Sequence, residues 1–364
     1  MLDPDIMEGQ LLEEFLKALQ ELPEVRAKFS GIEQPGGINR GHDAQVDLQA
    51  CGKAATLLIQ VKKEVYPRDV RQMLWPLRES AHGRLDPEAG RQAVIFLIAQ
   101  LISPGARELL RNERVGYYDS SGSLFLPAFN IYAYVDKPPP KSRSRSIRSV
   151  FSGRRAQVLH AILLRHREWF GVKDIANQAR VSPSTASQVL TELEKFGWVM
   201  SRGQGPGKKR HLQEPGALLD AWQNQEAVKR RLSMRRYFVP LARAEGLVEK
   251  FAEVCAEHKA EYAITHQAAG QRYAPFLSTI SQVRSRLLNG PAADRALGAL
   301  DARVVDQGAN LTVIEARSPG ELLFRECMNG IWLAGAVQVY LDLMRSEGRS
   351  REMARHLRDE RIGF

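Results

Sequence analysis

Residues 154–212 constrain the fold of this chain more than any other stretch. Apolar side chains recur at helical spacing over residues 155–166 and again over residues 172–178. A short turn, residues 179–181, then leads to Ser182 and Pro183. This pair is a strong signal for a helix start, because the serine hydroxyl can cap free N–H groups and proline has no N–H to leave unpaired. The stretch therefore predicts three short helices, the third over residues 183–196.

The third predicted helix divides into an apolar face and a polar face. The apolar residues have the spacing of a buried face, and they are Ala186, Val189, Leu190, Leu193 and Phe196. The polar residues are Ser184, Thr185, Ser187, Gln188, Thr191 and Lys195. Serine and threonine are poor helix formers, because their side chains compete for backbone hydrogen bonds. Such a face suits close contact with a DNA groove, where Gln188 can pair with adenine and a helix start at Ser182 attracts a phosphate.

A basic hairpin is predicted directly after this helix. Residues 198–201 and 208–212 have the character of strands, and the glycine-rich residues 203–207 connect them. Four cations edge the hairpin tip, which suits contact with phosphates or with a minor groove. They are Arg202, Lys208, Lys209 and Arg210.

The order of three helices and a hairpin resembles the winged helix-turn-helix superfamily over its whole length. Residues 174–212, DIANQARVSPSTASQVLTELEKFGWVMSRGQGPGKKRHL, are similar to bacterial regulators of the MarR or GntR type. The resemblance implies that double-stranded DNA is the partner. The alternative is a winged helix that serves only as a scaffold for protein contacts, and the basic hairpin argues against it.

The excess positive charge of the chain is confined to residues 137–236. This segment has 21 Lys/Arg against 7 Asp/Glu, a net charge of +14, whereas the rest has 31 against 35, a net charge of −4. Each phosphate that a cation neutralises releases counterions, so the segment suits a nucleic acid. Residues 137–153, with three consecutive prolines and a Ser/Arg run, predict a linker, and residues 215–236 a connecting basic helix. With Arg154 and Arg155, the linker is compatible either with a plain spacer or with an arm along the DNA backbone.

Residues 1–136 predict one α/β unit. Strands are expected over residues 44–48, 56–65, 93–99 and 115–118, and helices over residues 11–22, 68–79 and from residue 103 onward. Strands that alternate with helices imply a mixed sheet with helices packed on it.

The second of these strands carries Gln60 and Lys62, which strand periodicity puts on one face. Together with Asp47 on the preceding strand, they resemble the Q-x-K variant of the PD-(D/E)xK restriction-endonuclease-like superfamily. The resemblance covers about residues 8–136 and implies that Asp47 and Gln60 hold Mg²⁺, while Lys62 stabilises charge at the attacked phosphate. Glu13 or Glu14 would be an additional acid. Because Mg²⁺ prefers charged oxygens and Gln60 is neutral, an inactive copy of the fold is favoured over a working nuclease.

Residues 237–364 predict a third, α+β unit, with a strand over residues 311–316 and a final helix over residues 349–361. Gln338, Tyr340 and Asp342, followed by Gly348-Arg349 and the closing helix, resemble the C-terminal region of AbiEi-type antitoxins of type IV toxin–antitoxin systems. The resemblance implies a toxin protein or an effector as a partner of this unit. The additional N-terminal domain departs from the common layout of that family.

These observations predict a multidomain α/β and α+β protein, with a restriction-endonuclease-like domain (1–136), a linker (137–153), a winged helix (154–214), a connecting helix (215–236) and an antitoxin-like domain (237–364). No segment has the apolar length of a spanning helix, and the start of the chain lacks a signal peptide, so we expect a cytoplasmic protein without a membrane partner. Cys51, Cys255 and Cys327 form neither a disulfide framework nor a zinc pattern.

The leading functional hypothesis is an autoregulating, antitoxin-like repressor that needs no cofactor. The first alternative is a Mg²⁺-dependent nuclease targeted by its winged helix. The second is a repressor that responds to a small ligand. A homodimer would match a palindromic operator.

Overall fold

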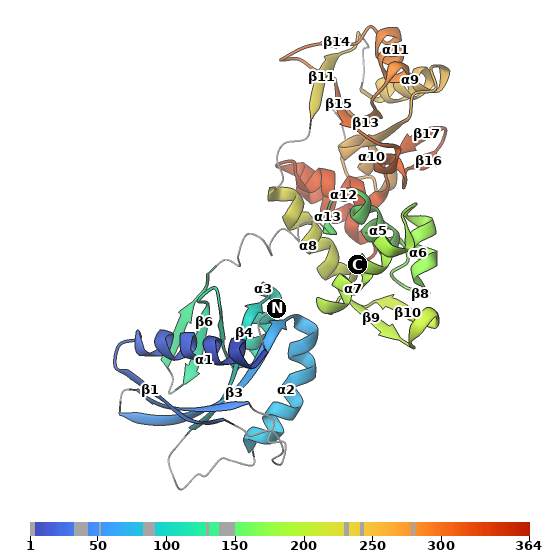
Figure 1. Cartoon of the computed structure of the whole chain (residues 1–364). Helices are drawn as coiled ribbons and strands as arrows, with labels where there is room; N and C mark the ends of the chain where they lie inside the picture. Colours follow the sequence, from blue (N-terminus) through green and yellow to red (C-terminus); the bar gives the residue numbers. More distant parts are fainter. Residues whose placement is uncertain are drawn as a thin grey trace. The chain divides into compact units, whose positions relative to one another are not determined.

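The computed structural model describes residues 4–32, 43–50, 52–82, 92–128, 131–137, 150–228, 233–240, 244–277, 280 and 282–364 (Figure 1). The chain divides into two compact units. The first consists of Met1–Ile147 with Glu192–Gly197, and the second of Arg148–Thr191 with Trp198–Phe364. Both contain helices and mixed sheets, so the expected mixed α/β class is confirmed.

In its described residues, the first unit has a seven-stranded sheet whose strands lie in sequence order. They are β1 (Val25–Ile32), β2 (Ala44–Ala50), β3 (Lys53–Val65), β4 (Gln92–Ile102), β5 (Gly116–Asp119), β6 (Leu124–Ala128) and β7 (Ile131–Val135). Strands β3, β4 and β5 run parallel to their neighbours in this group, and the remaining pairs are antiparallel. The sheet is mixed, as the sequence predicts, but β1, β6 and β7 were not expected.

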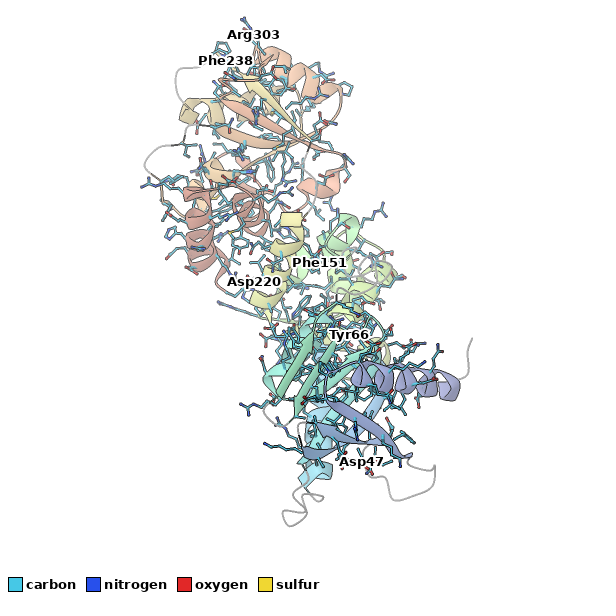
Figure 2. All side chains as sticks on the ribbon, turned by 90° about the vertical axis from the view of Figure 1, so that its left-hand side faces the viewer. Asp47, Tyr66, Phe151, Asp220, Phe238 and Arg303 are labelled. Atoms are coloured by element: carbon cyan, nitrogen blue, oxygen red, sulfur yellow. The ribbon has the colours of Figure 1, made fainter. Side chains whose placement is uncertain are left out.

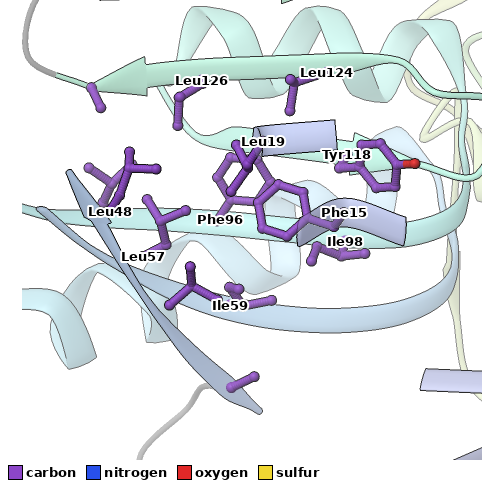
Figure 3. Close-up of a cluster of buried hydrophobic side chains, with 14 of the residues drawn as sticks. Phe15, Leu19, Leu48, Leu57, Ile59, Phe96, Ile98, Tyr118, Leu124 and Leu126 are labelled. Carbon is purple, nitrogen blue, oxygen red and sulfur yellow. The ribbon is translucent and has the colours of Figure 1, made fainter. Parts of the chain in front are cut away.

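Helices cover both faces of this sheet: α1 (Pro4–Gln20), α2 (Pro67–His82) and α3 (Pro104–Asn112). Phe15 and Leu19 of α1 pack against Phe96 and other side chains on one face (Figure 3). Val70 of α2 and Ala106 of α3 belong to a separate cluster on the other face. Helix α3 begins where the sequence predicts, because the Ser103 hydroxyl accepts a hydrogen bond from the N–H of Ala106 at 3.3 Å.

Alternation along β3 decides which side chains meet which helices. Ala55, Leu57, Ile59 and Val61 point into the cluster that contains α1. The residues that alternate with them, including Gln60 and Lys62, therefore belong to the face of α2 and α3. The prediction that Gln60 and Lys62 share one face is confirmed by this pattern.

The second unit begins with three helices and a small sheet. The elements are α5 (Gly153–Leu164), β8 (Trp169–Phe170), α6 (Val172–Gln178), α7 (Pro183–Lys195), β9 (Val199–Arg202), the short 3₁₀ turn Gly205–Gly207 and β10 (Lys209–Leu212). The division into units falls within α7, whose last residues from Glu192 onward are assigned to the first unit. The sheet order is β8-β10-β9, and both pairs are antiparallel. The predicted helices and hairpin are all present, within a few residues of their expected bounds. Val150 and Phe151 are buried, so the expected linker ends earlier than residue 153, because these apolar side chains pack.

Helix α8 (Pro215–Val228) ends earlier than expected. The sequence predicts a connecting helix through residue 236, but Met234–Phe238 form strand β11. Arg235 and Arg236 are therefore strand residues, and residues 229–232 lie outside the described part. Strand β11 pairs with β15 (Leu311–Ala316) on one side and with β14 (Arg303–Val304) on the other. Helix propensities of ordinary residues differ by at most about 0.7 kcal/mol per residue. Backbone pairing with two neighbouring strands outweighs such a preference, so this segment is a strand.

The rest of the second unit is built on a mixed sheet with the strand order β14-β11-β15-β13-β12-β17-β16. Its further strands are β12 (Tyr262–Thr265), β13 (Val283–Leu288), β16 (Glu326–Met328) and β17 (Ile331–Leu333). At one end of the sheet Phe238 pairs with Arg303 (Figure 2). The helices are α9 (Ala244–Glu257), α10 (His266–Tyr273), α11 (Pro291–Ala299), α12 (Ala336–Met344) and α13 (Arg349–Leu357). The predicted strand over residues 311–316 and the predicted closing helix are both confirmed.

None of the helices in the described residues combines the length and apolar character needed to cross a bilayer. Cys255 is buried, and burial raises the pKa of its thiol to about 12. Cys327 is exposed, and Cys51 lies outside the described residues.

Candidate nucleic-acid interface

Helix α7 has the two faces that its sequence predicts. Ala186, Val189, Leu190 and Leu193 are fully buried. Ser184, Gln188 and Thr191 are exposed and, at spacings of four and three residues, lie in one line along the helix. We call these three residues the polar stripe. The remaining polar positions, Thr185, Ser187 and Lys195, are half-buried beside it.

The start of α7 is capped as expected. The Ser182 hydroxyl accepts a hydrogen bond from the backbone N–H of Thr185 at 3.2 Å and contacts the Thr185 hydroxyl at 2.9 Å. The cap satisfies one of the free N–H groups of the first turn and leaves others pointing out of the helix end. The exposed first turn of α7 is therefore compatible with a phosphate oxygen.

The two arginines at the start of α5 have different surroundings. The guanidinium of Arg155 donates a hydrogen bond from Nη2 to the side-chain oxygen of Gln188 at 3.3 Å. This contact brings a cation directly to the polar stripe. Arg154 is exposed and instead lines a cavity on another side of α5. The sequence assigns both residues to DNA contact, and only Arg155 is placed beside the predicted DNA-contacting face.

The hairpin β9–β10 carries a pair of like charges side by side. Arg202 is the cross-strand neighbour of Lys209, and both are exposed. Like charges in this position are unfavourable without a counterion. Arg202 lies over the ring of Trp169 at 4.0 Å, and the ammonium of Lys209 is 3.5 Å from a carboxylate oxygen of Asp174. That exposed ion pair is weak, so a phosphate could replace Asp174 as the partner of Lys209.

The position of Arg210 disagrees most clearly with its predicted place at the interface. Its residue exposure is only 5%, and it lies on the same buried face of β10 as Leu212, while Lys209 is exposed on the other face. Strand alternation is the reason, because consecutive side chains on β10 point to opposite faces. Lys208 is half-buried, and Lys195 lies 3.5 Å from the carboxylate of Glu192, so neither is as open as Arg202 and Lys209.

The N-terminal site differs from the one the sequence predicts. Asp47 is the cross-strand neighbour of Thr56 and accepts a hydrogen bond from its hydroxyl at 3.1 Å (Figure 2). Gln60 is four residues further along β3, which is about 13 Å at the rise of a strand. The structure therefore does not bring Asp47 to Gln60 and Lys62. The hairpin register is the cause, since Ala50 pairs with Lys53 and fixes every partner along the two strands.

The carboxylate that the register brings closest to Gln60 is Asp43, which the sequence analysis missed. The N–H of Asp43 donates to the carbonyl of Ile59 at 2.7 Å, and its carboxylate accepts from the N–H of Val61 at 2.7 Å. Asp43 thus bonds to the residues on both sides of Gln60. The signal was available in the sequence, because a two-residue turn at positions 51 and 52 places residue 43 opposite residue 60.

The donor set at this site fits a magnesium ion poorly. Asp43 supplies one carboxylate, and Gln60 supplies a neutral oxygen that is buried and has no hydrogen-bond partner among the described residues. No group of three or more His, Cys, Asp or Glu side chains in the described part of the chain is arranged to hold a metal. Mg²⁺ sites in proteins depend on charged, hard oxygen ligands. The expected magnesium ligands Asp47 and Gln60 are accordingly not brought together.

The basic linker, residues 138–149, lies outside the described residues, so its expected role as a DNA arm stays a prediction. Comparison with known proteins gave no match: no family model fits the chain, and no curated protein and no solved structure is significantly similar to it.

Proposed function

We propose that residues 153–212 form a winged helix-turn-helix that binds double-stranded DNA, and that the chain is a sequence-specific transcriptional regulator. The observation that carries this proposal is the polar stripe on α7, with Arg155 bonded to Gln188 in its middle. An amide held by a guanidinium presents donors and acceptors to base edges, and the small hydroxyls of Ser184 and Thr191 allow close approach. Serine and threonine have lower helix propensity than alanine, leucine, lysine or glutamate, so they do not favour an exposed helix face that has no binding role.

The basic hairpin supports the same proposal. Arg202 and Lys209 place two exposed cations on neighbouring strands, as expected for contact with phosphates beside the groove that α7 would enter. In the proposed mechanism, the stripe selects the sequence, while the hairpin and the linker supply affinity that does not depend on sequence.

We further propose that the regulator acts on its own operon, as an antitoxin-like repressor. The support is the similarity of residues 338–349 to AbiEi-type antitoxins, and the toxin partner would bind the C-terminal part of the second unit. The nuclease alternative receives less support, because the described residues contain no group of three or more His, Cys, Asp or Glu side chains that could hold a metal ion.

The test is fluorescence anisotropy with the full chain and the DNA upstream of its own gene, against a scrambled duplex. Titrations over a salt series, with and without Mg²⁺, separate selective from purely electrostatic binding. We expect tighter binding to the upstream DNA, and DNA that stays intact. Equal affinity for both duplexes would refute sequence specificity, and fragments that appear only with Mg²⁺ would favour a nuclease.

A matched pair of variants locates the contact. Gln188→Ala removes the exposed amide of the polar stripe, and Asn224→Ala removes an exposed amide from α8. A lost base contact should weaken selective binding by roughly 1–3 kcal/mol in the first variant. The second variant should bind like the parent. Equal losses in both would place the DNA elsewhere.

A further inference from the structure

A cavity of about 550 Å³ lies within the second unit. One wall is the first half of α5, another is α8, and residues 318–325 and 334–338 supply most of the rest, together with Arg180, Ala263 and Arg286. Its volume falls in the range of about 300–1,000 Å³ that is typical of small-molecule sites. These segments are far apart in the sequence, so the cavity exists only once the second unit has folded.

Flat rings form part of the wall. His160 on α5 stacks on Phe324, with ring centroids 4.3 Å apart and planes 14° from parallel, and Trp222 on α8 meets His160 edge-on. Burial lowers the pKa of His160 to about 3, so the ring is neutral at physiological pH. Its Nε2 atom is buried and has no hydrogen-bond partner among the described residues. A buried polar atom without a partner is costly, which is a reason to expect that a ligand or water supplies one.

A buried arginine also lines this cavity. Arg286 is 6% exposed and donates two hydrogen bonds to Asp342, from Nε at 3.1 Å and from Nη2 at 2.6 Å. A guanidinium has five N–H donors. The other three have no partner among the side chains and backbone that the structure describes, although Arg286 lines the cavity. Donors of this kind are suited to an anionic or carbonyl oxygen.

Two more arginines line the cavity where it is exposed to solvent. Arg154 at the start of α5 and Arg180 in the turn before α7 form no ion pair with any described residue. The acidic lining residue Glu226 is already paired with Arg345 at 2.9 Å, while Glu321 accepts a bond from the backbone N–H of Arg317. The backbone bond leaves the charge of Glu321 in place, so among the described lining residues two arginines without an ion pair outnumber one such carboxylate, and the lining is positive on balance.

We infer that this cavity binds a planar ring that carries an anionic group, a ligand of the size of a mononucleotide. The ring would lie against the His160, Phe324 and Trp222 side chains, and the anion would bind the exposed pair Arg154 and Arg180 together with the free donors of Arg286. The inference goes beyond DNA binding and does not depend on it. Because Arg180 lies in the turn between α6 and α7, a ligand held here would also touch the segment that leads into the helix of the polar stripe.

The test is isothermal titration calorimetry of the full chain with AMP and GMP at physiological salt. The nucleosides adenosine and guanosine and inorganic phosphate are the matched halves, the first two without the anion and the last without the ring. We expect at least one nucleotide to bind about tenfold or more tightly than either half, because both groups bind together. Failure of both nucleotides to bind, or equal affinity for a nucleotide and its halves, would overturn the inference.

Substitutions within and beside the lining locate the site. Arg154→Gln/Arg180→Gln removes the free cations of the cavity, and we expect a loss of about tenfold or more in nucleotide affinity. Arg155→Gln, one residue away but outside the lining, should leave the affinity unchanged. Ala156→Phe fills the cavity without a change of charge, and it should abolish binding while the melting temperature shows that the variant is folded.

One further variant excludes binding on the proposed DNA surface. Arg202→Ala/Lys209→Ala removes the exposed cations of the hairpin and should leave nucleotide affinity as it is in the parent chain. Loss of nucleotide binding in this variant, or in Arg155→Gln, would mean that the nucleotide binds the DNA surface and would contradict a site in the cavity. DNA binding is measured in parallel, so a failure of the cavity proposal remains distinct from a failure of the regulator proposal.

Discussion

Arg286 donates hydrogen bonds to both carboxylate oxygens of Asp342, and both side chains are buried. Asp342 also accepts a bond from the Thr265 hydroxyl at 2.6 Å and one from Gln338 at 3.0 Å. This one carboxylate thus connects β12 and β13 to α12. Burial alone would raise the pKa of Asp342. The charge of Arg286 and the hydrogen bonds to the carboxylate outweigh burial, so the pKa falls to about 2.

Removal of Asp342 should therefore destabilise the second unit. Asp342→Ala leaves the Arg286 charge buried and unpaired, and we expect a loss of about 3–5 kcal/mol in the free energy of unfolding. Urea denaturation followed by tryptophan fluorescence measures the loss. The double variant Arg286→Met/Asp342→Leu should lose much less, because no charge remains buried. A double variant as unstable as Asp342→Ala would show that the ion pair itself, and not the unpaired charge, decides stability.

Two buried histidines should make stability depend on pH. The pKa of His160 is lowered to about 3 and that of His266 to about 4, from the ordinary value of 6.5. Burial is the main cause in both, because it disfavours the charged ring. The unfolded chain therefore takes up protons first as the pH falls below 6.5, and stability decreases until the folded-state pKa values are reached. By pH 5 each histidine should have removed about 2 kcal/mol.

Urea unfolding at pH 7.5, 6 and 5 measures this decrease. His160→Phe should reduce the dependence on pH, because one of the two buried groups is then absent. His258→Gln, at a half-buried position, is the control and should keep the full dependence. Stability that stays constant between pH 7.5 and pH 5 would contradict the assignment of both histidines as neutral in the folded chain.

The neighbours Lys209 and Arg210 should behave differently when substituted. Lys209→Ala removes an exposed cation from the proposed DNA contact, so the slope of log affinity against log salt should fall by about 1 with little change in stability. Arg210→Ala removes a buried side chain, and it should instead lower the free energy of unfolding by about 1–3 kcal/mol with the salt slope unchanged. The reverse result would mean that Arg210 and not Lys209 faces DNA.

A single substitution should create a cation site in the first unit. Gln60→Glu places a second carboxylate opposite Asp43, and two charged oxygens suit Mg²⁺ or Mn²⁺. We expect the variant to bind Mn²⁺ about tenfold more tightly than the parent, as measured by calorimetry. The gain should disappear in Gln60→Glu/Asp43→Ala and persist in Gln60→Glu/Asp47→Ala. Dependence on Asp47 instead would contradict the strand register.

Local signals in the sequence were sufficient for much of the second unit. Ser182-Pro183 marks the start of α7, and the apolar spacing that follows predicts its buried face. The run at residues 311–316 has the length and composition of a buried strand, and β15 has those bounds. In both cases local preference and tertiary packing favour the same structure, which is why a pattern of a few residues is enough.

The errors arise where pairing between distant segments decides the outcome. Residues up to 236 have the composition of a basic helix. Residues 234–238 nevertheless form β11, because their backbone pairs with β15 on one side and with β14 on the other. Asp43 was missed in favour of Asp47 because strand register, and not sequence spacing alone, determines which carboxylate meets Gln60. The cavity lined by His160 and Phe324 could not be predicted, since its walls come from segments more than one hundred and fifty residues apart.

The position of β11 determines where this chain can be divided. A fragment that begins at Val239 would lack the strand between β14 and β15, and both would then have open edges. Exposed strand edges pair with other chains, so such a fragment should aggregate. A soluble C-terminal fragment must therefore begin before Met234, because the domain boundary predicted at residue 237 would cut through this strand.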